Sequence, residues 1–366
     1  MAKHANVQLI QPIPYFPIAR PLPDWARTAE HTVDGMAVRH QPMFYFPGVL
    51  KSLDGRWLAR AIDGPVQAWQ RLAPVDAIDA HFGYPDGVGA VLTARRHGIP
   101  AFVTIRGLET DRVRERFVRG QMIAALNAAT ACISVSHSLA ALMIKNGVAQ
   151  SRIAVIPNGI ETSTFRPGPR SHARAALGLS PTARLVVSVG HLISGKRHDV
   201  LMKAIAALEG VQLAIIGGRD YEPEQPARLR RLAEELRLAD RVRFVGAVPP
   251  REVANWLRAA DVFALATARE GCCNAILEAL ACGVPVVTTP AGDNRHYVLE
   301  GQNGHLVPID DAPAMATALA AALARDWNQA RISATLAVGN WESVGRRVLE
   351  VFAERLGAAN RTVGSA

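Results

Sequence analysis

Residues 268–290, "AREGCCNAILEALACGVPVVTTP", combine thiol and carboxylate side chains in one short stretch. Three of the chain's four cysteines lie here: Cys272, Cys273 and Cys282. Two glutamates, Glu270 and Glu278, are separated by seven residues among small apolar side chains. The thiols would suit metal or redox chemistry, whereas the carboxylates would suit the binding of a hydroxyl-rich ligand. The first question is which of the two sets is functional.

The spacing of the cysteines argues against a metal or redox site. A structural zinc site needs paired ligands, such as C-x-x-C pairs at matched spacing. Cys272 and Cys273 are adjacent, which suits chelation poorly, and Cys282 lies on or just past the following helix. Free cysteines in such places behave as small buried apolar residues. We therefore predict packing roles for the thiols and no metal site.

The two glutamates occupy different places in a predicted strand–loop–helix unit. The stretch "DVFALATAREGCCNAILEALACG" reads as a strand, a loop, a helix and a glycine that ends the helix. Glu270 then lies in the loop beyond the strand, beside a helix N-terminus that can bind an anion or hydroxyl groups. Glu278 lies two turns along the helix. These positions equally suit a helix-capping glutamate and a solvated one, so the stretch alone leaves both interpretations open.

A second loop carries cations from a strand into a helix. In "SVGHLISGKRHD", Gly190 ends the strand, and Lys196 and Arg197 precede the helix. Backbone donors and two cations in such a place predict a phosphate-binding loop. The loop is not a Walker motif, because Arg197 stands where Ser or Thr is required, and the G-x-G-x-x-G fingerprint is missing. Glycines in "IIGG" (215–218) and "FVGAV" (244–248) end two more strands and leave room for a base or ribose.

The elements that must position these loops alternate between apolar strands and amphipathic helices. Six strands are predicted from residue 184 onward, at 184–190, 211–218, 241–248, 261–267, 284–289 and 304–308. Helices are predicted between them at 198–208, 226–238 and 250–260. This alternation requires a parallel sheet covered on both faces, with ligands beyond the carboxyl ends of its strands. Both loops and the glycines then meet at one edge of one sheet.

The first half of the chain repeats this α/β rhythm less regularly. Strands are predicted at 6–12, 76–83, 101–107, 131–136 and 152–159. A stretch rich in Pro, Gly and Ser, 165–183, indicates a domain boundary. We predict an α/β chain of two Rossmann-like, doubly wound domains that face a cleft, over residues 1–170 and 171–340. An amphipathic helix at 341–358 is expected to complete the first domain.

The composition fits a globular protein of two domains. The chain has 366 residues, of which 49% are apolar and 20% charged. Lys and Arg exceed Asp and Glu by 41 − 32 = 9, but the arginines are scattered and often paired with acids. That pattern favours solvated helix faces, with a basic patch facing anionic lipid as the alternative, and it argues against nucleic acid. No apolar run is long enough to span a bilayer, and four cysteines without paired spacing favour the cytoplasm.

The sequence resembles the family-four retaining glycosyltransferases of the GT-B fold. "AADVFALATAREGCCNAILEALACGVPVV" (259–287) matches the family's Glu, seven residues, Glu motif in order and spacing. "SVGHLISGKRHD" resembles the family's diphosphate-binding loop, and residues 133–167 resemble its interdomain lead-in. Residues 76–111 resemble a subset associated with extracellular polysaccharide assembly. The resemblance covers roughly residues 70–356.

The resemblance implies a donor-binding role for the carboxyl edge of the second domain, over 171–340. Glu270 would contact the transferred sugar, Glu278 the ribose of the nucleotide, and Lys196 the leaving diphosphate. Further donor-binding positions are implied around these three: Gly190, His191, Arg197, Gly217, Gly246, Val248, Gly271, Cys272, Cys273 and Asn274.

In the N-terminal domain the resemblance implies acceptor-side roles. Arg106, in "TIRGLETD", stands where many members have a histidine that faces the donor, so it is predicted to be catalytic together with Glu270 and Lys196. His81, in "DAHFGYPDG", lies at a strand end and is predicted on the acceptor side.

The implied chemistry needs no cofactor. Breaking a glycosyl–phosphate bond builds negative charge on the diphosphate, which cations and helix-end N–H groups stabilise. A D-x-D metal motif near the cleft is absent from the sequence, so we predict a metal-independent reaction. No obvious nucleophile is placed to attack the far face of the sugar. We therefore predict front-face attack with retention of anomeric configuration.

The sequence departs from the family pattern in three places. Members usually open with a strand, a glycine-bearing loop and a helix before the segment that resembles "NVQLIQPIPYFP", and the N-terminal domain is expected to lack these. Arg197 replaces the glycine that usually follows the lysine, and His296 replaces the usual acidic residue after the "PVV" strand.

The leading hypothesis is a retaining glycosyltransferase that moves a sugar from a nucleotide-diphosphate-sugar to a lipid-linked or polysaccharide acceptor in cell-envelope or exopolysaccharide biosynthesis. It would be cytoplasmic, with a basic surface that contacts the inner face of the membrane. Two alternatives stay open: a nucleotide-sugar 2-epimerase on the same fold, and a truncated, non-catalytic partner that binds nucleotide sugar.

Overall fold

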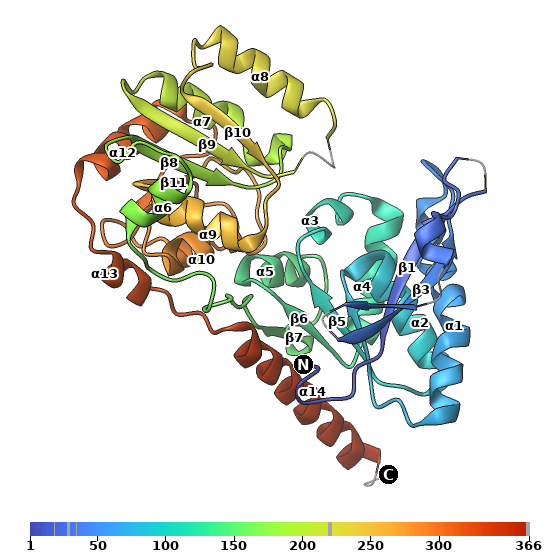
Figure 1. Cartoon of the computed structure of the whole chain (residues 1–366). Coiled ribbons are helices and arrows are strands. Elements are labelled where there is room, and N and C mark those ends of the chain that lie inside the picture. The colour runs from blue at the N-terminus through green and yellow to red at the C-terminus, as the bar shows by residue number, and fades with distance from the viewer. Residues whose placement is uncertain (18, 28–29, 34, 219–221, 364–366) are drawn as a thin grey trace. The chain divides into compact units, whose positions relative to one another are not determined.

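A computed structural model describes residues 1–17, 19–27, 30–33, 35–218 and 222–363 (Figure 1). The chain divides into two compact units. The N-terminal unit comprises Met1–Pro157 together with Glu342–Ala366, and the C-terminal unit comprises Asn158–Trp341. The division after Pro157 lies before the boundary that the sequence predicts at residue 170.

The C-terminal unit is built on a six-stranded parallel sheet (Figure 1). Its strands are β8 (Arg184–Val189), β9 (Val211–Ile216), β10 (Val242–Gly246), β11 (Val262–Leu265), β12 (Val286–Thr288) and β13 (Gly304–Leu306). They lie in the order β10-β9-β8-β11-β12-β13. The order reverses between β8 and β11, which is the doubly wound arrangement, and it confirms the predicted fold class.

Helices cover both faces of this sheet. They are α6 (Arg170–Ala176), α7 (His198–Ala206), α8 (Gln225–Glu235), α9 (Pro250–Ala259), α10 (Asn274–Ala281), α11 (Asn294–Tyr297), α12 (Ala312–Ala324) and α13 (Gln329–Ala334). Successive strand residues alternate between two apolar cores: Val186 packs into one and Val187 into the other. This alternation is why the strands are apolar at nearly every position.

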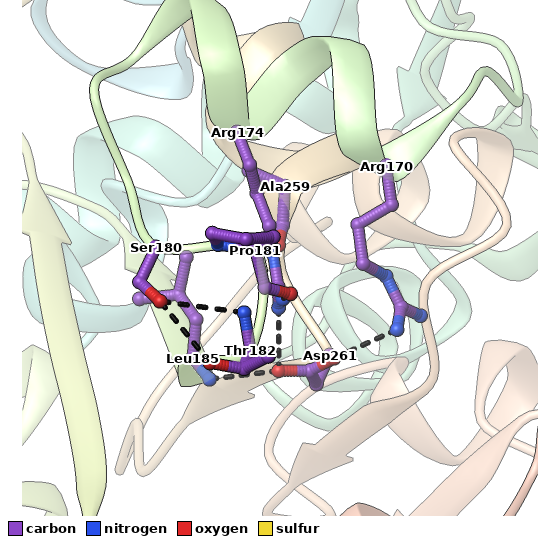
Figure 2. A network of polar contacts seen from close by, with 8 residues as sticks. All are labelled: Arg170, Arg174, Ser180, Pro181, Thr182, Leu185, Ala259 and Asp261. Carbon is purple, nitrogen blue, oxygen red and sulfur yellow. Dashed lines mark hydrogen bonds and ion pairs between the residues drawn. The ribbon is translucent and has the colours of Figure 1, made fainter.

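An ion network joins α6 to the amino ends of β8 and β11 (Figure 2). The Asp261 carboxylate accepts from Arg170, from Arg174 and from the backbone N–H of Leu185, each at 2.8 Å. The Arg174 side chain, only 6% exposed, also donates to the carbonyls of Ala259 and Pro181. This network fixes the edge of the sheet that lies opposite the predicted site.

The N-terminal unit contains two sheets. The parallel sheet β4-β5-β6-β7 comprises β4 (Ile78–His81), β5 (Ala101–Ile105), β6 (Ala131–Ser134) and β7 (Ile153–Val155). The sheet β1-β3-β2 comprises β1 (Leu9–Tyr15), β2 (Glu30–Val33) and β3 (Met36–Phe44), of which β2 and β3 are not predicted by the sequence. The expected loss of an initial strand, loop and helix stays a prediction.

Six α-helices of the N-terminal unit lie among the described residues. They are α1 (Asp54–Leu72), α2 (Val88–His97), α3 (Glu109–Arg112), α4 (Arg116–Ala128), α5 (His137–Lys145) and α14 (Trp341–Val363). Short helical turns lie at Asp24–Arg27, Lys51–Leu53, Gly83–Gly87 and Gln150–Arg152, and one at Ser194–Lys196 belongs to the other unit.

The last helix, α14, packs on the N-terminal unit (Figure 1). Its stripe Val348, Val351 and Phe352 is buried against the parallel sheet, and the Phe352 ring stacks on Phe102 at a centroid distance of 3.8 Å. The 3.6-residue spacing of the apolar residues produces this buried stripe. None of the helices in the described ranges combines the length and apolar character needed to cross a bilayer.

Candidate functional site

Two loops meet at the carboxyl edge of the C-terminal sheet, at the point where the strand order reverses. One follows β8 and the other follows β11, and these strands are neighbours. The backbone N–H of Ala268 donates to the carbonyl of Gly195 at 2.9 Å. The Thr267 hydroxyl donates to the same carbonyl at 3.2 Å. The loops that the sequence singled out separately are therefore joined into one surface.

Lys196 and Glu270 form an ion pair between these loops. The Lys196 Nζ lies 2.5 Å from Glu270 Oε1, and the two side chains are only 18% and 8% exposed. The stem of Lys196 crosses over Gly190, where an added Cβ would lie 3.5 Å from Lys196 Cδ and Cε. The pair thus connects the predicted phosphate-binding loop to the predicted sugar-binding glutamate.

The charge of Lys196 is maintained by this pair. Burial works to lower the pKa of the ammonium, yet nearby negative charge raises the pKa of Lys196 above its ordinary value. Two nearby groups could supply that charge, the Cys273 thiol and the Glu270 carboxylate. Burial and Glu270 both raise the pKa of the Cys273 thiol, which keeps it neutral, so the Glu270 carboxylate supplies the charge. Lys196 is therefore a cation at neutral pH whose counter-charge is a single carboxylate.

The helix α10 begins at Asn274, four residues after Glu270. Cys273 is buried in the apolar core and Cys272 is half-buried, and burial raises the pKa of both thiols. Asn274, the first residue of the helix, is exposed, and its Oδ1 accepts from Asn158 Nδ2 at 2.8 Å. In the described part of the chain no cluster of three or more His, Cys, Asp or Glu side chains is arranged to hold a metal ion.

Glu278 lies about one turn after Asn274 on α10 and lines a pocket of about 520 Å³. Asn274, Arg251 and Trp341 line the same pocket. Burial raises the pKa of the Glu278 carboxyl to about 7. Among the described residues, no hydrogen bond or ion pair engages this carboxyl, so it is available to a ligand with hydroxyl donors.

The predicted glycines serve close packing at the strand ends. A Cβ at Gly217 would lie 1.9 Å from the carbonyl oxygen of Gly190, so only glycine fits between these two loops. Gly217 N–H donates to the carbonyl of Gly246, whose φ of +88° is a left-handed conformation. Val248 packs against the apolar core. The predicted contacts of Gly217, Gly246 and Val248 with the ribose and base stay predictions.

Arg197 and His191 take different roles from Lys196 in the same loop. Arg197 has a φ of 53°, in the left-handed region, and its Nη2 lies 2.7 Å from Asp310 Oδ2. Its guanidinium is thus engaged by the protein, and its predicted contact with phosphate stays a prediction. The carbonyl of His191 pairs with His198 Nε2 at 3.2 Å, and burial lowers the pKa of His198 to about 4.

Arg106 and His81 lie together in the N-terminal unit, at the carboxyl ends of β5 and β4. Arg106 Nη1 is 2.8 Å from His81 Nδ1, and His81 Nε2 is 3.4 Å from Asp79 Oδ2. The nearby Asp86 is half-buried, and this burial raises its pKa to about 6 despite the opposing effect of His81. The structure therefore brings together the two N-terminal residues that the sequence analysis named.

Two family profiles cover most of the chain. A profile described as Glycosyltransferase Family 4 matches residues 22–164, and one described as Glycosyl transferases group 1 matches residues 183–325. A D-inositol 3-phosphate glycosyltransferase from Xylanimonas cellulosilytica is 30% identical over 350 residues, which cover 87% of this chain and 82% of the relative. The chain belongs to the family-four glycosyltransferases. A protein of the same name from Frankia alni is 28% identical, over 91% of this chain and 88% of its own.

Solved structures show that this glycosyltransferase has the GT-B fold. Sucrose-phosphate synthase from Thermosynechococcus elongatus superposes with a TM-score of 0.76 at 22% identity, over 90% of this chain and 86% of its own. HepE from Anabaena, solved with UDP and glucose, superposes with a TM-score of 0.75 at 20% identity, over 87% and 86% of the two chains. At these identities the similarity establishes the fold alone.

The structure of the glycosyltransferase adds three residues to those that the sequence analysis named. Asn158 contacts Asn274, as described above. Gly292 has a φ of +57°, and a Cβ there would lie 2.5 Å from the carbonyl oxygen of Glu270, so only glycine allows the loops to approach. Glu109 is fully buried beside Arg106. Leu108 and Thr110 flank it in the sequence, and no local pattern there indicates that it is buried.

Proposed function

We propose that this glycosyltransferase moves a sugar from a nucleotide-diphosphate-sugar to a lipid-linked or polysaccharide acceptor, with retention of configuration. The observation that supports this most strongly is the Lys196–Glu270 pair at the switch point of the sheet. The two side chains are mostly buried and share one short contact. The cation suits a diphosphate, and the carboxylate suits a polyhydroxyl ligand beside it.

Donor binding exchanges the partners of this pair. The diphosphate takes the place of Glu270 as the counter-charge of Lys196, and Glu270 turns to accept hydrogen bonds from the sugar hydroxyls. The ribose hydroxyls donate to Glu278, whose carboxyl faces the pocket of about 520 Å³. The segment from Glu270 to Glu278 thereby contacts both the sugar and the ribose of the donor.

The reaction exchanges one bond at the anomeric carbon for another and moves one proton. The bond between the anomeric carbon and the phosphate oxygen breaks, and its electron pair leaves with the diphosphate, which Lys196 stabilises. The acceptor oxygen attacks from the same face, and its proton passes to the departing phosphate oxygen. NMR of the product gives the anomeric configuration, and inversion would contradict this mechanism.

The choice of donors and acceptors for the assay follows from the relatives. HepE was solved with UDP and with UDP-glucose, so UDP-sugars are the first donors to test. The curated relatives are named for inositol 3-phosphate, and residues 76–111 resemble proteins of polysaccharide assembly. Acceptors should therefore include inositol 3-phosphate, lipid-linked sugars and polysaccharide fragments.

An exposed apolar and basic segment supports contact with an anionic membrane surface. Phe117, in the first turn of α4, is 76% exposed, and Arg114, Arg116 and Arg119 around it are also exposed. An aromatic ring among cations suits the interface of anionic lipid. Co-sedimentation with anionic vesicles should exceed that with neutral vesicles and fall for Phe117→Ser; equal sedimentation with both would contradict the contact.

The central experiment measures release of nucleoside diphosphate from UDP-sugars with each acceptor class. Glu270→Ala and Lys196→Ala should abolish release, since they remove the two partners of the donor. Lys203→Ala is the matched control, because Lys203 is an exposed lysine on α7, just beyond the same loop. A comparable loss in the control would contradict the assignment.

The same assay separates the two alternatives. Conversion of the donor with no acceptor present would indicate a 2-epimerase. Binding of UDP without release from any donor, unchanged by Lys196→Ala, would indicate a non-catalytic partner.

A further inference from the structure

Glu109 is a buried carboxylate to which neither the motifs nor the proposed function assigns a role. It is the first residue of α3 and is 0% exposed. Its Oε1 accepts from the backbone N–H of Gly83 at 2.7 Å, and its Oε2 accepts from the backbone N–H of Gly107 at 2.7 Å. Charge-assisted bonds of this length are strong, and a buried carboxylate needs both of them.

The two glycines belong to the loops that follow neighbouring strands. Gly83 follows β4 and Gly107 follows β5, and these strands pair with His81 opposite Thr104. One side chain therefore fixes two loops relative to each other. The loops carry His81, two residues before Gly83, and Arg106, immediately before Gly107.

The loop after β4 has a strained backbone that Glu109 helps to hold. Phe82, between His81 and Gly83, has a φ of 75°, which is rare for a residue other than glycine. Such a conformation persists only where surrounding contacts determine it, and it is often associated with function. Phe82 N–H donates to the Thr104 carbonyl at 2.8 Å, and the next N–H, that of Gly83, donates to the Glu109 carboxylate.

The result of this arrangement is a defined contact between Arg106 and His81. Arg106 Nη1 donates to His81 Nδ1 at 2.8 Å, so the imidazole proton resides on Nε2, towards Asp79. A change of a few tenths of an ångström in either loop would alter this contact.

We propose that Glu109 is a positioning residue, which locks the loops after β4 and β5 so that Arg106 and His81 present one fixed pair of groups to the substrate. The inference rests on the proposed function, for which the sequence predicts a catalytic Arg106 and an acceptor-side His81. A carboxylate suits the role because it has two acceptor oxygens for two N–H groups. The amide of Glu109→Gln would turn its NH₂ group towards one of them.

The test compares Glu109→Gln with Asn127→Ala. Asn127 also joins two backbone positions of the same unit, since it donates to the Gly147 carbonyl at 2.8 Å and accepts from the Ala149 N–H at 2.9 Å. Asn127 lies in the last turn of α4, before β6, away from the loops of His81 and Arg106. We expect kcat to fall about 10- to 100-fold in Glu109→Gln, because small displacements of positioned groups have effects of that size. The Kd for UDP should stay unchanged, and Asn127→Ala should keep kcat within about twofold.

A second readout reports the pair directly. The ¹⁵N shifts of the His81 ring, assigned with His81→Gln, should show the Nε2–H tautomer in the wild type and in Asn127→Ala. They should show a mixture of tautomers in Glu109→Gln. The two variants are compared at a similar loss of stability. If Glu109→Gln then keeps the wild-type tautomer, or keeps the wild-type kcat, the proposal is overturned. If the wild type transfers no sugar at all, the proposed function fails, but the NMR comparison still decides the role of Glu109.

Discussion

The two edges of the C-terminal sheet each hold ion pairs, but the pairs differ in how fully they are satisfied. At the amino edge, the Asp261 carboxylate has three partners, and the Arg174 guanidinium donates to it and to two carbonyls (Figure 2). At the carboxyl edge, Lys196 and Glu270 share a single contact of 2.5 Å. In the described chain no other hydrogen bond of the Lys196 ammonium is found, although it has three donors.

This difference separates stability from ligand binding. A buried charge whose hydrogen-bonding capacity is used by fixed protein groups cannot accept a ligand without losing one of them. A cation with one movable partner can exchange that partner for a diphosphate. The Glu278 carboxyl, close to the same edge, also has no hydrogen-bond partner among the described residues. Burial raises its pKa to about 7, so it is partly protonated near neutral pH. We therefore expect substitutions at the two edges to have opposite effects on stability and activity.

The largest effect on activity is expected from replacing both partners at the carboxyl edge. Lys196→Met combined with Glu270→Gln removes both charges, so neither is left buried and unpaired. Sugar transfer should fall at least about 10³-fold, while the free energy of unfolding should change by less than about 1 kcal/mol. Initial rates and urea unfolding of the same preparations measure the two quantities. A large loss of stability would show that this pair is structural like its counterpart.

The reverse result is expected at the amino edge. Asp261→Asn leaves the buried Arg174 guanidinium without its counter-charge, which should lower the free energy of unfolding by about 3 kcal/mol or more. Transfer per folded molecule should stay within about twofold of the wild type, because the network lies at the opposite ends of the strands. Urea unfolding gives the first value, and rates at low temperature, where the variant is folded, give the second. Loss of activity in the fully folded variant would contradict the separation.

The structure brings together at the carboxyl edge the two loops that the sequence singled out, because the signals for each loop are local. Gly190 and Lys196 lie within one loop, and Glu270 and Glu278 lie within one loop and helix. The strand alternation then placed both loops at one edge of a parallel sheet. The doubly wound fold followed from the same alternation and is confirmed by the strand order.

Contacts between residues far apart in the chain were not predictable in this way. Arg174 and Asp261 are 87 residues apart, and each alone resembles a surface residue. Arg197 was predicted to face phosphate, but Asp310, 113 residues away, engages its guanidinium. Glu109 likewise owes its burial to the loop of Gly83, which no local pattern reveals. Partners of this kind depend on packing between elements rather than on spacing along the chain.

A smaller effect, visible in the pH dependence of stability, is expected from Glu278→Gln. The Glu278 carboxyl titrates at about 7 in the folded chain and near its ordinary value of 4.5 when unfolded. Between these values the folded state binds more protons, so this group lowers the free energy of unfolding as pH rises, by about 3 kcal/mol in all. The variant should therefore gain stability relative to the wild type from pH 4.5 to 7.5. Urea unfolding at several pH values measures this, with the exposed Glu235→Gln as control; parallel curves would refute it.

The smallest effect is expected from Arg197→Gly, although Arg197 is adjacent to Lys196. Glycine adopts the left-handed φ of 53° without strain, which offsets the loss of a half-exposed ion pair with Asp310. The free energy of unfolding should change by less than about 1 kcal/mol, and transfer by less than about threefold, as measured by urea unfolding and initial rates. A tenfold or greater rise in the Kd for UDP would show instead that Arg197 leaves Asp310 when the donor binds. In that case two cations, rather than Lys196 alone, would exchange protein carboxylates for the diphosphate at this edge of the sheet.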